Sequence, residues 1–498
     1  MNVNPITRLD YPDPDVIRVE DTYYMVSTTM HFMPGCEILQ SFDLVHWEHV
    51  TYVYETLDHT DAQQLKSGQN IYGQGMWAAS LRYHEGRFCI CFVANDTRKT
   101  YLYTSEKIDG PWKKQLIEGF YHDGSLLFDE DGRNYIVYGN DEIWITELNE
   151  DLTAPKKDGL HRLLVSDHKN PELGYEGSHI QKINGYYYIF LVHSLRDRWM
   201  RTEACFYSDS LEGEFTGGDV LCDDRGYCGQ GVAQGGIVDT PDGKWYAMLF
   251  QDSGAVGRIP ILVPVTWKDH FPFFGQNGHV PEEIEVHSTR PGYIYQPLVG
   301  SDDFCNGLLP RWQFNHDPDP RYYHLDALQG TYTITTREVC TELTQAVNTL
   351  TQRMSYPSCA AEVTVDASAL KEGDVAGLCA LQSCYAAVGI TKHHGKYEVL
   401  MLDKKEDGIL DMTEGTVVES HQMDFRLEAD FCNMKDEARC YYRVNKGDWL
   451  PIGTVHKLYF KLDHFTGCRF GLFCYAAEET GGSACFRDFK YYDVDEIS

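Results

Sequence analysis

The sequence is short of basic residues: 43 lysines and arginines stand against 75 aspartates and glutamates, which gives a formal charge of −32. A phosphate-covered partner would be repelled by this charge, so nucleic acids and anionic membranes are excluded as partners. The sequence contains no run of 18 apolar residues, and its opening MNVNPITRLDYPDPDV has neither a basic nor an apolar signal-peptide region. We therefore expect a cytoplasmic protein with no membrane partner.

Paired CxxC motifs are also missing, although the chain has 16 cysteines. Cys222 and Cys228 lie too far apart for a zinc knuckle, and many of the other cysteines sit inside apolar, strand-like runs. We predict reduced, buried thiols rather than disulfides, and no structural zinc site.

An internal repeat dominates what the sequence does contain. An apolar strand, a turn and an aromatic strand recur five times, and each occurrence is typical of a β-hairpin. The five occurrences are VIRVEDTYYMVSTT from Val16, SLRYHEGRFCICFVAN from Ser80, SLLFDEDGRNYIVYGN from Ser125, SHIQKINGYYYIFLVHS from Ser178 and GGIVDTPDGKWYAMLFQ from Gly235. The predicted turns are Glu20-Asp21, Glu85-Gly86, Asp131-Gly132, Asn184-Gly185 and Asp242-Gly243. Another strand-like segment follows each hairpin, so each unit has at least three strands.

Small antiparallel units that cannot bury both faces alone indicate blades around an axis. We predict an all-β protein in which residues 1–297 form a five-bladed β-propeller; a two-sheet sandwich with accidental internal similarity is the alternative. Beyond residue 297 the repeat stops while strand-like runs continue, so residues 298–498 are predicted to form a separate β-sandwich. The 33 tyrosines, 23 phenylalanines and 9 tryptophans suit pleated surfaces and also sugar-binding sites.

Residues just upstream of each innermost strand should meet at one mouth of the propeller channel. This rule nominates five positions: Asp13, Trp77, Asp123, Glu176 and Gln234. Three of them are acids, although packing requires none there, and like charges about 4 Å apart repel by several kcal/mol in a partly desolvated site. Paired carboxylates perform glycoside hydrolysis, where one protonates the departing oxygen and another activates water or attacks directly. Taken singly, each acid could instead serve in a turn or on the surface.

Three segments around these acids resemble the catalytic blocks of glycoside hydrolase family 43. They are NPITRLDYPDPDVIRVEDTYYMVSTT, HDGSLLFDEDGRNYIVYG and YEGSHIQKINGYYYIF. In the second domain, DDFCNGLLPRWQFNHDPDP looks like the accessory β-sandwich of the xylosidase-like members. The family comprises five-bladed propellers, among them β-xylosidases and α-L-arabinofuranosidases, that invert the anomeric configuration. The resemblance implies that Asp13 is the general base, Glu176 the general acid, and Asp123 the residue that tunes the pKa of the acid and orients it.

The resemblance also implies substrate-binding residues. Arg258 in GAVGRIP matches the arginine that reaches into the family's sugar pocket, with an arginine on a surface loop as the alternative. Trp77 and Phe32 are expected to stack on a pentose ring, unless they pack between blades. The loop TTMHFMPG, which contains His31 and Met33, differs from the Trp-containing loop of close xylosidase relatives. It leaves the choice between xylose and arabinose open.

Gln234 stands where many family members have a histidine that supports a water-coordinated calcium ion in the channel. A neutral amide lacks the coordinating lone pair of imidazole. Because acid–base hydrolysis needs no metal, we expect no tightly bound metal and no required cofactor.

The predicted function is exo-acting, inverting hydrolysis that releases a terminal pentose from short hemicellulose oligosaccharides, with β-1,4-xylosidase activity favoured. An α-L-arabinofuranosidase or a bifunctional enzyme is the alternative, and a non-hydrolytic carbohydrate-binding propeller is a more distant one. The partner is then a small oligosaccharide, and homo-oligomerisation stays open. The second domain could be a binding module, an oligomer interface or a cover over the active-site mouth, and the resemblance favours the cover.

Overall fold

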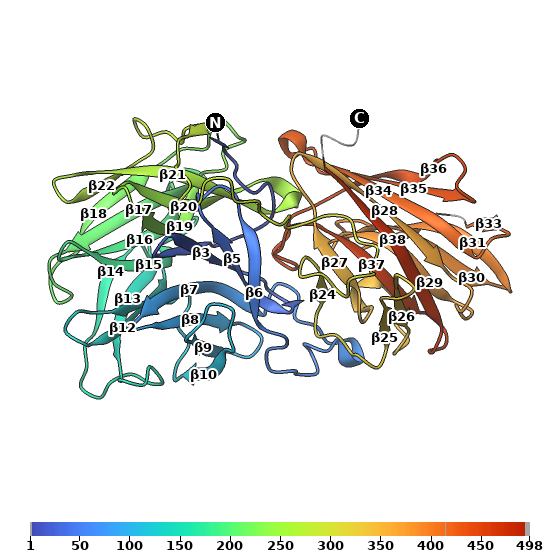
Figure 1. Ribbon diagram of the computed structural model, residues 1–498, viewed down its shortest axis with the longest axis horizontal. Coiled ribbons are helices and arrows are strands. Elements are labelled where there is room, and N and C mark those ends of the chain that lie inside the picture. The colour runs from blue at the N-terminus through green and yellow to red at the C-terminus, as the bar shows by residue number, and fades with distance from the viewer. Residues whose placement is uncertain (1, 414, 494–498) are drawn as a thin grey trace.

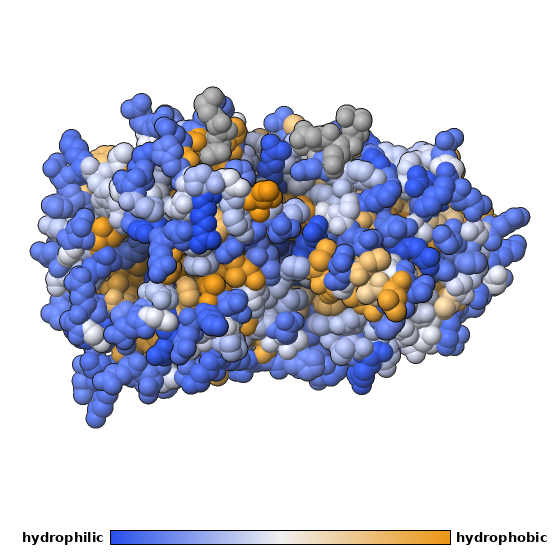
Figure 2. Space-filling view, viewed as in Figure 1, coloured by the Kyte–Doolittle hydropathy of each residue, from blue (hydrophilic) through white to orange (hydrophobic). Residues whose placement is uncertain are grey.

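The computed structural model describes residues 2–413 and 415–493. A β-propeller lies on the left of Figure 1 and a β-sandwich on the right, which confirms the predicted all-β architecture. Four 3₁₀ turns complete the described helical structure: η1 (Lys66–Gly68), η2 (Gly254–Val256), η3 (Leu343–Gln345) and η4 (Cys432–Met434). Within the described ranges, no helix is long and apolar enough to cross a membrane. Hydrophilic residues cover most of the face seen in Figure 2, in keeping with the large number of acidic residues.

Five four-stranded antiparallel blades make up the propeller. The first two blades are β2 (Asp15–Val19), β3 (Thr22–Ser27), β5 (Gly35–Ser41), β6 (Glu48–Tyr54) and β7 (Met76–His84), β8 (Arg87–Ala94), β9 (Lys99–Ser105), β10 (Lys113–Ile117). The third is β11 (Ser125–Phe128), β12 (Asn134–Asn140), β13 (Glu142–Leu148), β14 (His161–Ser166). The fourth and fifth are β15 (Glu176–Ile183), β16 (Tyr186–Ser194), β17 (Arg201–Ser208), β18 (Thr216–Leu221) and β19 (Ala233–Asp239), β20 (Trp245–Asp252), β21 (Arg258–Lys268), β22 (Phe271–Phe274).

The five sequence repeats are the inner hairpins of these blades. Their turns contain residues with positive φ, among them Glu20 (56°), Glu85 (49°) and Asn184 (52°), as tight hairpins require. The fourth, outermost strands were not predicted individually. In β10 the pattern KKQLI buries Ile117 alone, so this edge strand carries little of the apolar alternation by which strands are recognised.

Apolar clusters between successive blades hold the ring together. Leu81 and Ile90 of the second blade pack with Val26 and Ile38 of the first, and corresponding clusters join each later pair of blades. The ring closes where the fifth blade packs against the first. At the edge, β1 (Asn2–Val3) pairs with β23 (Glu283–Ile284), which ties the N-terminal segment to the chain leaving the last blade.

All 16 cysteines are free, and ten of them are buried. Cys89 and Cys91 exemplify the buried ones, since both belong to the apolar cluster between the second and third blades. Burial raises the pKa of Cys89 to about 11 and that of Cys91 to about 12, so both are neutral packing groups at pH 7.

Two antiparallel sheets face each other in the sandwich, and their inner faces form the largest apolar cluster of the described chain. The first sheet is β32 (Leu410–Met412), β31 (Lys396–Lys404), β30 (Ala386–His393), β29 (Asp374–Leu381), β37 (Arg469–Ala476), β27 (Leu350–Arg353), β24 (Gln313–Asn315) and β4 (Phe32–Met33), with β33 (Thr416–Val418) beside β31. The second is β25 (Tyr323–Asp326), β26 (Thr331–Thr335), β38 (Ser483–Asp493), β28 (Ser358–Asp366), β34 (Gln422–Asp430), β35 (Glu437–Val444) and β36 (Leu450–Lys457).

One strand of the first sheet comes from the propeller region of the sequence. β4 lies between β3 and β5 in sequence but pairs with β24 of the sandwich. Buried polar contacts reinforce this junction: Arg353 forms an ion pair with Glu37 at 2.9 Å, and the Gly467 N–H donates to Asp10 at 2.8 Å. The two domains therefore share a sheet and a buried polar interface.

Candidate active site

The five positions nominated from the sequence lie at or just before the start of the inner strands. Asp13 and Asp123 precede β2 and β11, Glu176 begins β15, and Trp77 and Gln234 are second in β7 and β19. The backbone is left-handed at Asp13 (φ 52°), Asp123 (49°) and Gln234 (60°). Such φ values are uncommon for residues other than glycine and cluster at functional sites.

Asp13 is held by two donors. The Arg258 guanidinium donates to one carboxylate oxygen at 3.0 Å, and the Thr28 hydroxyl donates to the other at 2.7 Å. Arg258 also lies 3.4 Å from a carboxylate oxygen of Asp252. Asp13 is 6% exposed, so both donors fix a carboxylate that is largely shielded from water.

Asp123 and Glu176 meet a histidine that sequence reasoning did not nominate. His122 Nε2 lies 3.5 Å from Asp123 Oδ2 and 3.8 Å from Glu176 Oε2. The Gly177 N–H donates to Asp123 Oδ2 at 2.9 Å, and the Asn140 amide donates to Glu176 Oε2 at 2.8 Å. His122 directly precedes Asp123 at the same mouth, so the register that nominated Asp123 could have included it.

These groups perturb one another electrostatically. Burial raises the pKa of Asp123 to about 6; Glu176 and Asp13 act in the same direction, and His122 opposes them. The negative charge of Asp123 raises the pKa of His122 to about 9 against the effect of burial, with Glu176 adding to it. A carboxyl group with a shifted pKa beside a cation in a concave site is typical of catalytic centres.

A cavity of about 440 Å³ opens beside Glu176 and Arg258. Its lining combines residues of both domains: Leu173, Glu176, Trp199, Arg201, Gln230, Asp252, Gly254 and Arg258 from the propeller, and Met434, Phe460, Leu462 and Phe465 from the sandwich. Phe465 contacts the Trp77 ring, with centroids 5.4 Å apart, and its own ring centroid lies 4.6 Å from the Arg258 guanidinium carbon. The sandwich thus covers one side of the mouth and completes its wall.

A second arginine in this wall was also missed. Arg201 is 7% exposed and forms an ion pair with Asp252, the residue that also approaches Arg258. Burial and the neighbouring Arg258 lower the pKa of Arg201 to about 9. Asp252 thereby joins two cations that border the cavity. Nothing in the local sequence predicts this, because Arg201 lies in the fourth blade and Asp252 in the fifth, and the two meet only in the folded propeller.

Phe32 and His31 are fully buried and are not among the residues that line this cavity, so a contact of Phe32 with the sugar stays a prediction. Phe32 lies in β4, and its ring centroid is 3.5 Å from the guanidinium carbon of Arg469 in the sandwich. His31 packs against His316 and His464. Pairing of β4 with β24 places this loop at the junction of the two domains.

Gln234 offers a poor setting for the calcium ion that the resemblance implies. Its main-chain N–H donates to Glu203 Oε2 at 2.7 Å, and its side chain packs against Gly177. Burial raises the pKa of Glu203 well above its usual value, which disfavours the charged form that a calcium ion prefers as a ligand. His179 is engaged by Asp15 at 3.1 Å. These residues do not fit a resident calcium ion, and no catalytic step is derived through one.

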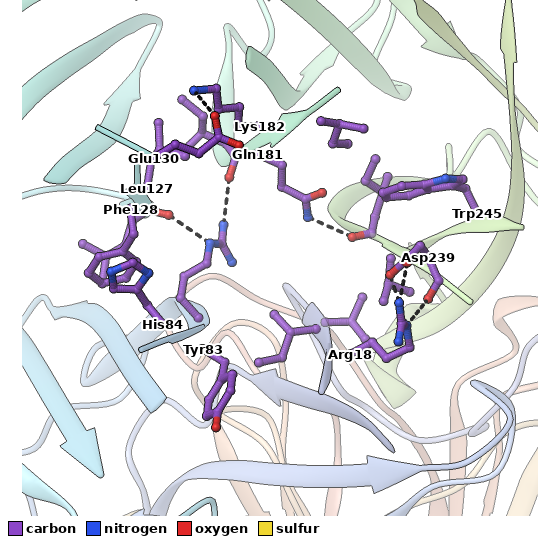
Figure 3. A pocket seen from close by; sticks show the side chains of 18 residues that line it. Arg18, Tyr83, His84, Leu127, Phe128, Glu130, Gln181, Lys182, Asp239 and Trp245 are labelled. Atoms are coloured by element: carbon purple, nitrogen blue, oxygen red, sulfur yellow. Dashed lines mark hydrogen bonds and ion pairs between the residues drawn. The ribbon is translucent and has the colours of Figure 1, made fainter. Parts of the chain in front are cut away.

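The opposite ends of the same inner strands line a second cavity of about 500 Å³ (Figure 3). Its basic side chains are paired: Arg18 with Asp239, Arg82 with Asp15 at 2.7 Å, and Lys182 with Glu130 at 3.1 Å and with Asp129. This mouth has the larger volume but lacks a converging set of acids among its lining residues.

Comparisons with known proteins agree with this geometry. A family model described as "Glycosyl hydrolases family 43" matches residues 3–272, more than half of the chain. A model described as "Beta xylosidase C-terminal Concanavalin A-like domain" matches residues 301–492.

Several relatives carry glycosidase names. The chain is 26% identical to a β-xylosidase of Formosa agariphila, covering 99% of this chain and 89% of the relative. It is 24% identical to a non-reducing end α-L-arabinofuranosidase of Bacteroides ovatus, covering 82% and 79%. Among solved structures, a bifunctional GH43-CE protein of Bacteroides eggerthii matches with 42% identity and a TM-score of 0.93. It covers all of this chain, which spans 64% of that protein's length. The chain therefore belongs to glycoside hydrolase family 43 and is a glycoside hydrolase.

Proposed function

We propose that the chain is an exo-acting, inverting enzyme that releases a terminal pentose from short hemicellulose oligosaccharides, with β-1,4-xylosidase activity favoured. The observation that carries this proposal is the convergence of Asp13, Asp123 and Glu176 beside Arg258 at one covered mouth of the propeller. The name of the Formosa agariphila relative supports the substrate class. α-L-Arabinofuranosidase activity is the second candidate, because the Bacteroides ovatus relative carries that name.

Glu176 has the placement of a general acid. It lines the cavity, and its side chain is 20% exposed, so a glycosidic oxygen bound there is within its reach. Asn140 and His122 on one side fix the direction of its carboxyl group. In the proposed reaction, Glu176 protonates the leaving oxygen as the bond to the anomeric carbon breaks.

Asp13 has the placement of a general base. One carboxylate oxygen of Asp13 accepts a hydrogen bond from Arg258, and the other accepts one from Thr28. Each oxygen has a further lone pair that can accept a proton from water. The activated water attacks the anomeric carbon on the face opposite the leaving group, which inverts its configuration. This chemistry requires the two carboxyl groups to stand about 6.5–9.5 Å apart, whereas about 5 Å would correspond to retention.

Asp123 acts through its neighbours in this scheme. It is 6% exposed, and it binds the main chain of Gly177 next to the general acid. Its charge and that of His122 set the electrostatic environment in which Glu176 holds and releases its proton.

The sandwich supports exo action. Phe460, Leu462 and Phe465 close one side of the cavity, so an oligosaccharide end fits more readily than the middle of a polymer. We propose that hydrolysis needs no cofactor, since the chain's own side chains supply the acid, the base and the sugar-binding cation.

A proton NMR time course tests the proposal. Purified protein is incubated with xylobiose and, separately, with an arabinofuranosyl-substituted xylo-oligosaccharide. Initial release of α-xylose from the β-linked disaccharide is the expected result. Release of arabinose alone would instead establish the second candidate. Initial formation of β-xylose would contradict inversion, and no hydrolysis of either compound would contradict the proposed substrate class.

A further inference from the structure

We propose that His122, Asp123 and Glu176 form a binding site for a divalent transition-metal cation such as Zn²⁺, and that the bound cation blocks hydrolysis. Binding itself is independent of the proposed function, whereas the inhibitory part rests on it because Glu176 is the proposed acid. The site is distinct from the channel position around Gln234, whose residues do not fit calcium.

The donor atoms are already gathered. One atom of each residue lies within 4.8 Å of the other two, and His122 Nε2 is 3.5 Å from Asp123 Oδ2 and 3.8 Å from Glu176 Oε2. Zinc ligands at about 2.0–2.2 Å from a tetrahedral ion stand roughly 3.3–3.6 Å from one another. A cation between these atoms therefore needs small side-chain movements and no change of the backbone.

His122 completes the donor set. Its Nε2 is buried and lies within ion-pair distance of both carboxylates. The other two donors each keep a supporting bond, from the Gly177 N–H to Asp123 and from Asn140 to Glu176. A metal ion would replace the ion pairs among these three side chains, and the two supporting bonds would keep the carboxylates oriented toward it.

The donor set selects the kind of cation. One imidazole nitrogen and two carboxylate oxygens suit Zn²⁺, Cu²⁺, Ni²⁺ or Co²⁺, whereas Mg²⁺ and Ca²⁺ prefer oxygen ligands alone. Three protein ligands also leave a fourth position, and Glu176 borders the cavity through which a cation and its water can enter.

Protons compete with the metal at this site. Only a neutral imidazole can bind a cation, so binding should tighten as the pH rises. A bound cation would hold the Glu176 carboxylate in a metal bond, where it carries no proton for the leaving group.

The test combines direct binding with activity. Protein treated with EDTA and desalted is titrated with Zn²⁺ by calorimetry and with Co²⁺ by visible absorption, and hydrolysis is measured with and without Zn²⁺. The variants are His122→Gln and Asp123→Asn, and the matched control is His168→Gln, whose imidazole contacts Ser166 on an exposed loop. Each variant's inhibition is compared with its own activity without metal.

We expect one Zn²⁺ per chain at this site and inhibition at the same concentration, both unchanged in His168→Gln. Loss of one ligand in His122→Gln or Asp123→Asn should weaken Zn²⁺ binding by more than about 100-fold. Mutation of a residue that only hydrogen-bonds to a metal ligand typically weakens metal binding by about 10–100-fold. Ca²⁺ and Mg²⁺ should not compete. Zn²⁺ binding that survives in both ligand variants, or no binding at 1 mM Zn²⁺ (about the weakest affinity of interest), would overturn the site. Metal binding in a protein that hydrolyses no pentoside would support the site while contradicting the proposed function.

Discussion

The two mouths of the propeller channel are built from the same five strands, yet they differ in how their charges are arranged. At the C-terminal ends of β2, β7 and β15, Arg18, Arg82 and Lys182 each have an acidic partner. At the N-terminal ends, acids converge, and burial raises the pKa of Asp123 to about 6. Both mouths are hollow, with volumes of about 500 and 440 Å³. The comparison teaches that converging acids, one of them with a perturbed pKa, point to the candidate catalytic mouth, whereas volume does not.

The largest expected effect comes from replacing one acid by its amide at each mouth. Glu176→Gln removes the proposed proton donor, so hydrolysis of xylobiose should fall by about 10²–10⁴-fold, the usual contribution of a general acid. Glu130→Gln is the matched change at the opposite mouth, where the Glu130 side chain is 84% exposed, and its kcat should stay at the wild-type value. Steady-state kinetics on both proteins measure the effect, and an unchanged Glu176→Gln enzyme would remove the distinction between the mouths.

A smaller effect is expected from the arginines. Arg258→Lys keeps the charge but loses the planar contact with both Asp13 and Asp252. Hydrogen bonds to charged groups contribute about 1.5–3 kcal/mol, so kcat/KM should fall by about 10–100-fold. Arg18→Lys disturbs the pair with Asp239 on the opposite side and should leave kcat/KM unchanged. Equal losses in the two variants would mean that catalysis does not depend on which mouth is altered.

The two mouths also differ in their cover, because the sandwich closes one side of the catalytic mouth. Phe465→Ala removes the ring that packs on Trp77 and Arg258, and KM for short oligosaccharides should rise by about tenfold, as loss of aromatic burial worth about 1.5 kcal/mol predicts. Leu328→Ala, on an exposed part of the sandwich, serves as the control. Unchanged KM in Phe465→Ala would show that the cover does not contact substrate.

The last effect concerns stability rather than catalysis: how the cover is held. His464 adjoins Phe465 and packs against His31, and Arg469 also faces the pair. Burial lowers the pKa of His464 to about 3, so the folded state keeps it neutral while the unfolded state takes up a proton near pH 6.5. Stability should therefore fall as the pH drops from 6.5 toward 3, with a contribution of up to about 1.4 kcal/mol per pH unit from this residue.

Urea unfolding at several pH values measures that contribution as a slope. His464→Gln should reduce the slope of the unfolding free energy against pH by about the amount that corresponds to one proton. This change in slope does not depend on how the substitution alters stability at pH 7. His287→Gln, whose side chain is 67% exposed, should leave the slope as it is. A slope that stays the same in His464→Gln would mean that this histidine is protonated in the folded protein.

Much of the fold was open to prediction because its signals are local. Each inner hairpin carries its own alternation and its own turn, and five copies strengthen the pattern. The outer strands escaped because an edge strand such as β10 buries little and has no periodicity to read. The three acids were predicted for a related reason. Each lies just before one of the repeats in the sequence, and this spacing places it at the propeller axis.

The rest of the site was beyond sequence reasoning. His122 was overlooked although it adjoins Asp123, because a histidine before a turn has no distinctive pattern. Arg201 and Asp252 meet only where the fourth and fifth blades adjoin. The burial of Phe32 was not foreseen because its strand pairs with a partner about 280 residues away.

By itself, the sequence determined the five blades, the positions of the acids on the axis and the presence of a second β domain, because strand alternation and turns act over a few residues. Only the tertiary structure decided which aromatic residues face the cavity, which cations accompany the acids, and that the sandwich completes the wall. Those features depend on contacts between residues hundreds of positions apart, and burial, which shifts the pKa values of Asp123 and His122, exists only once those contacts have formed.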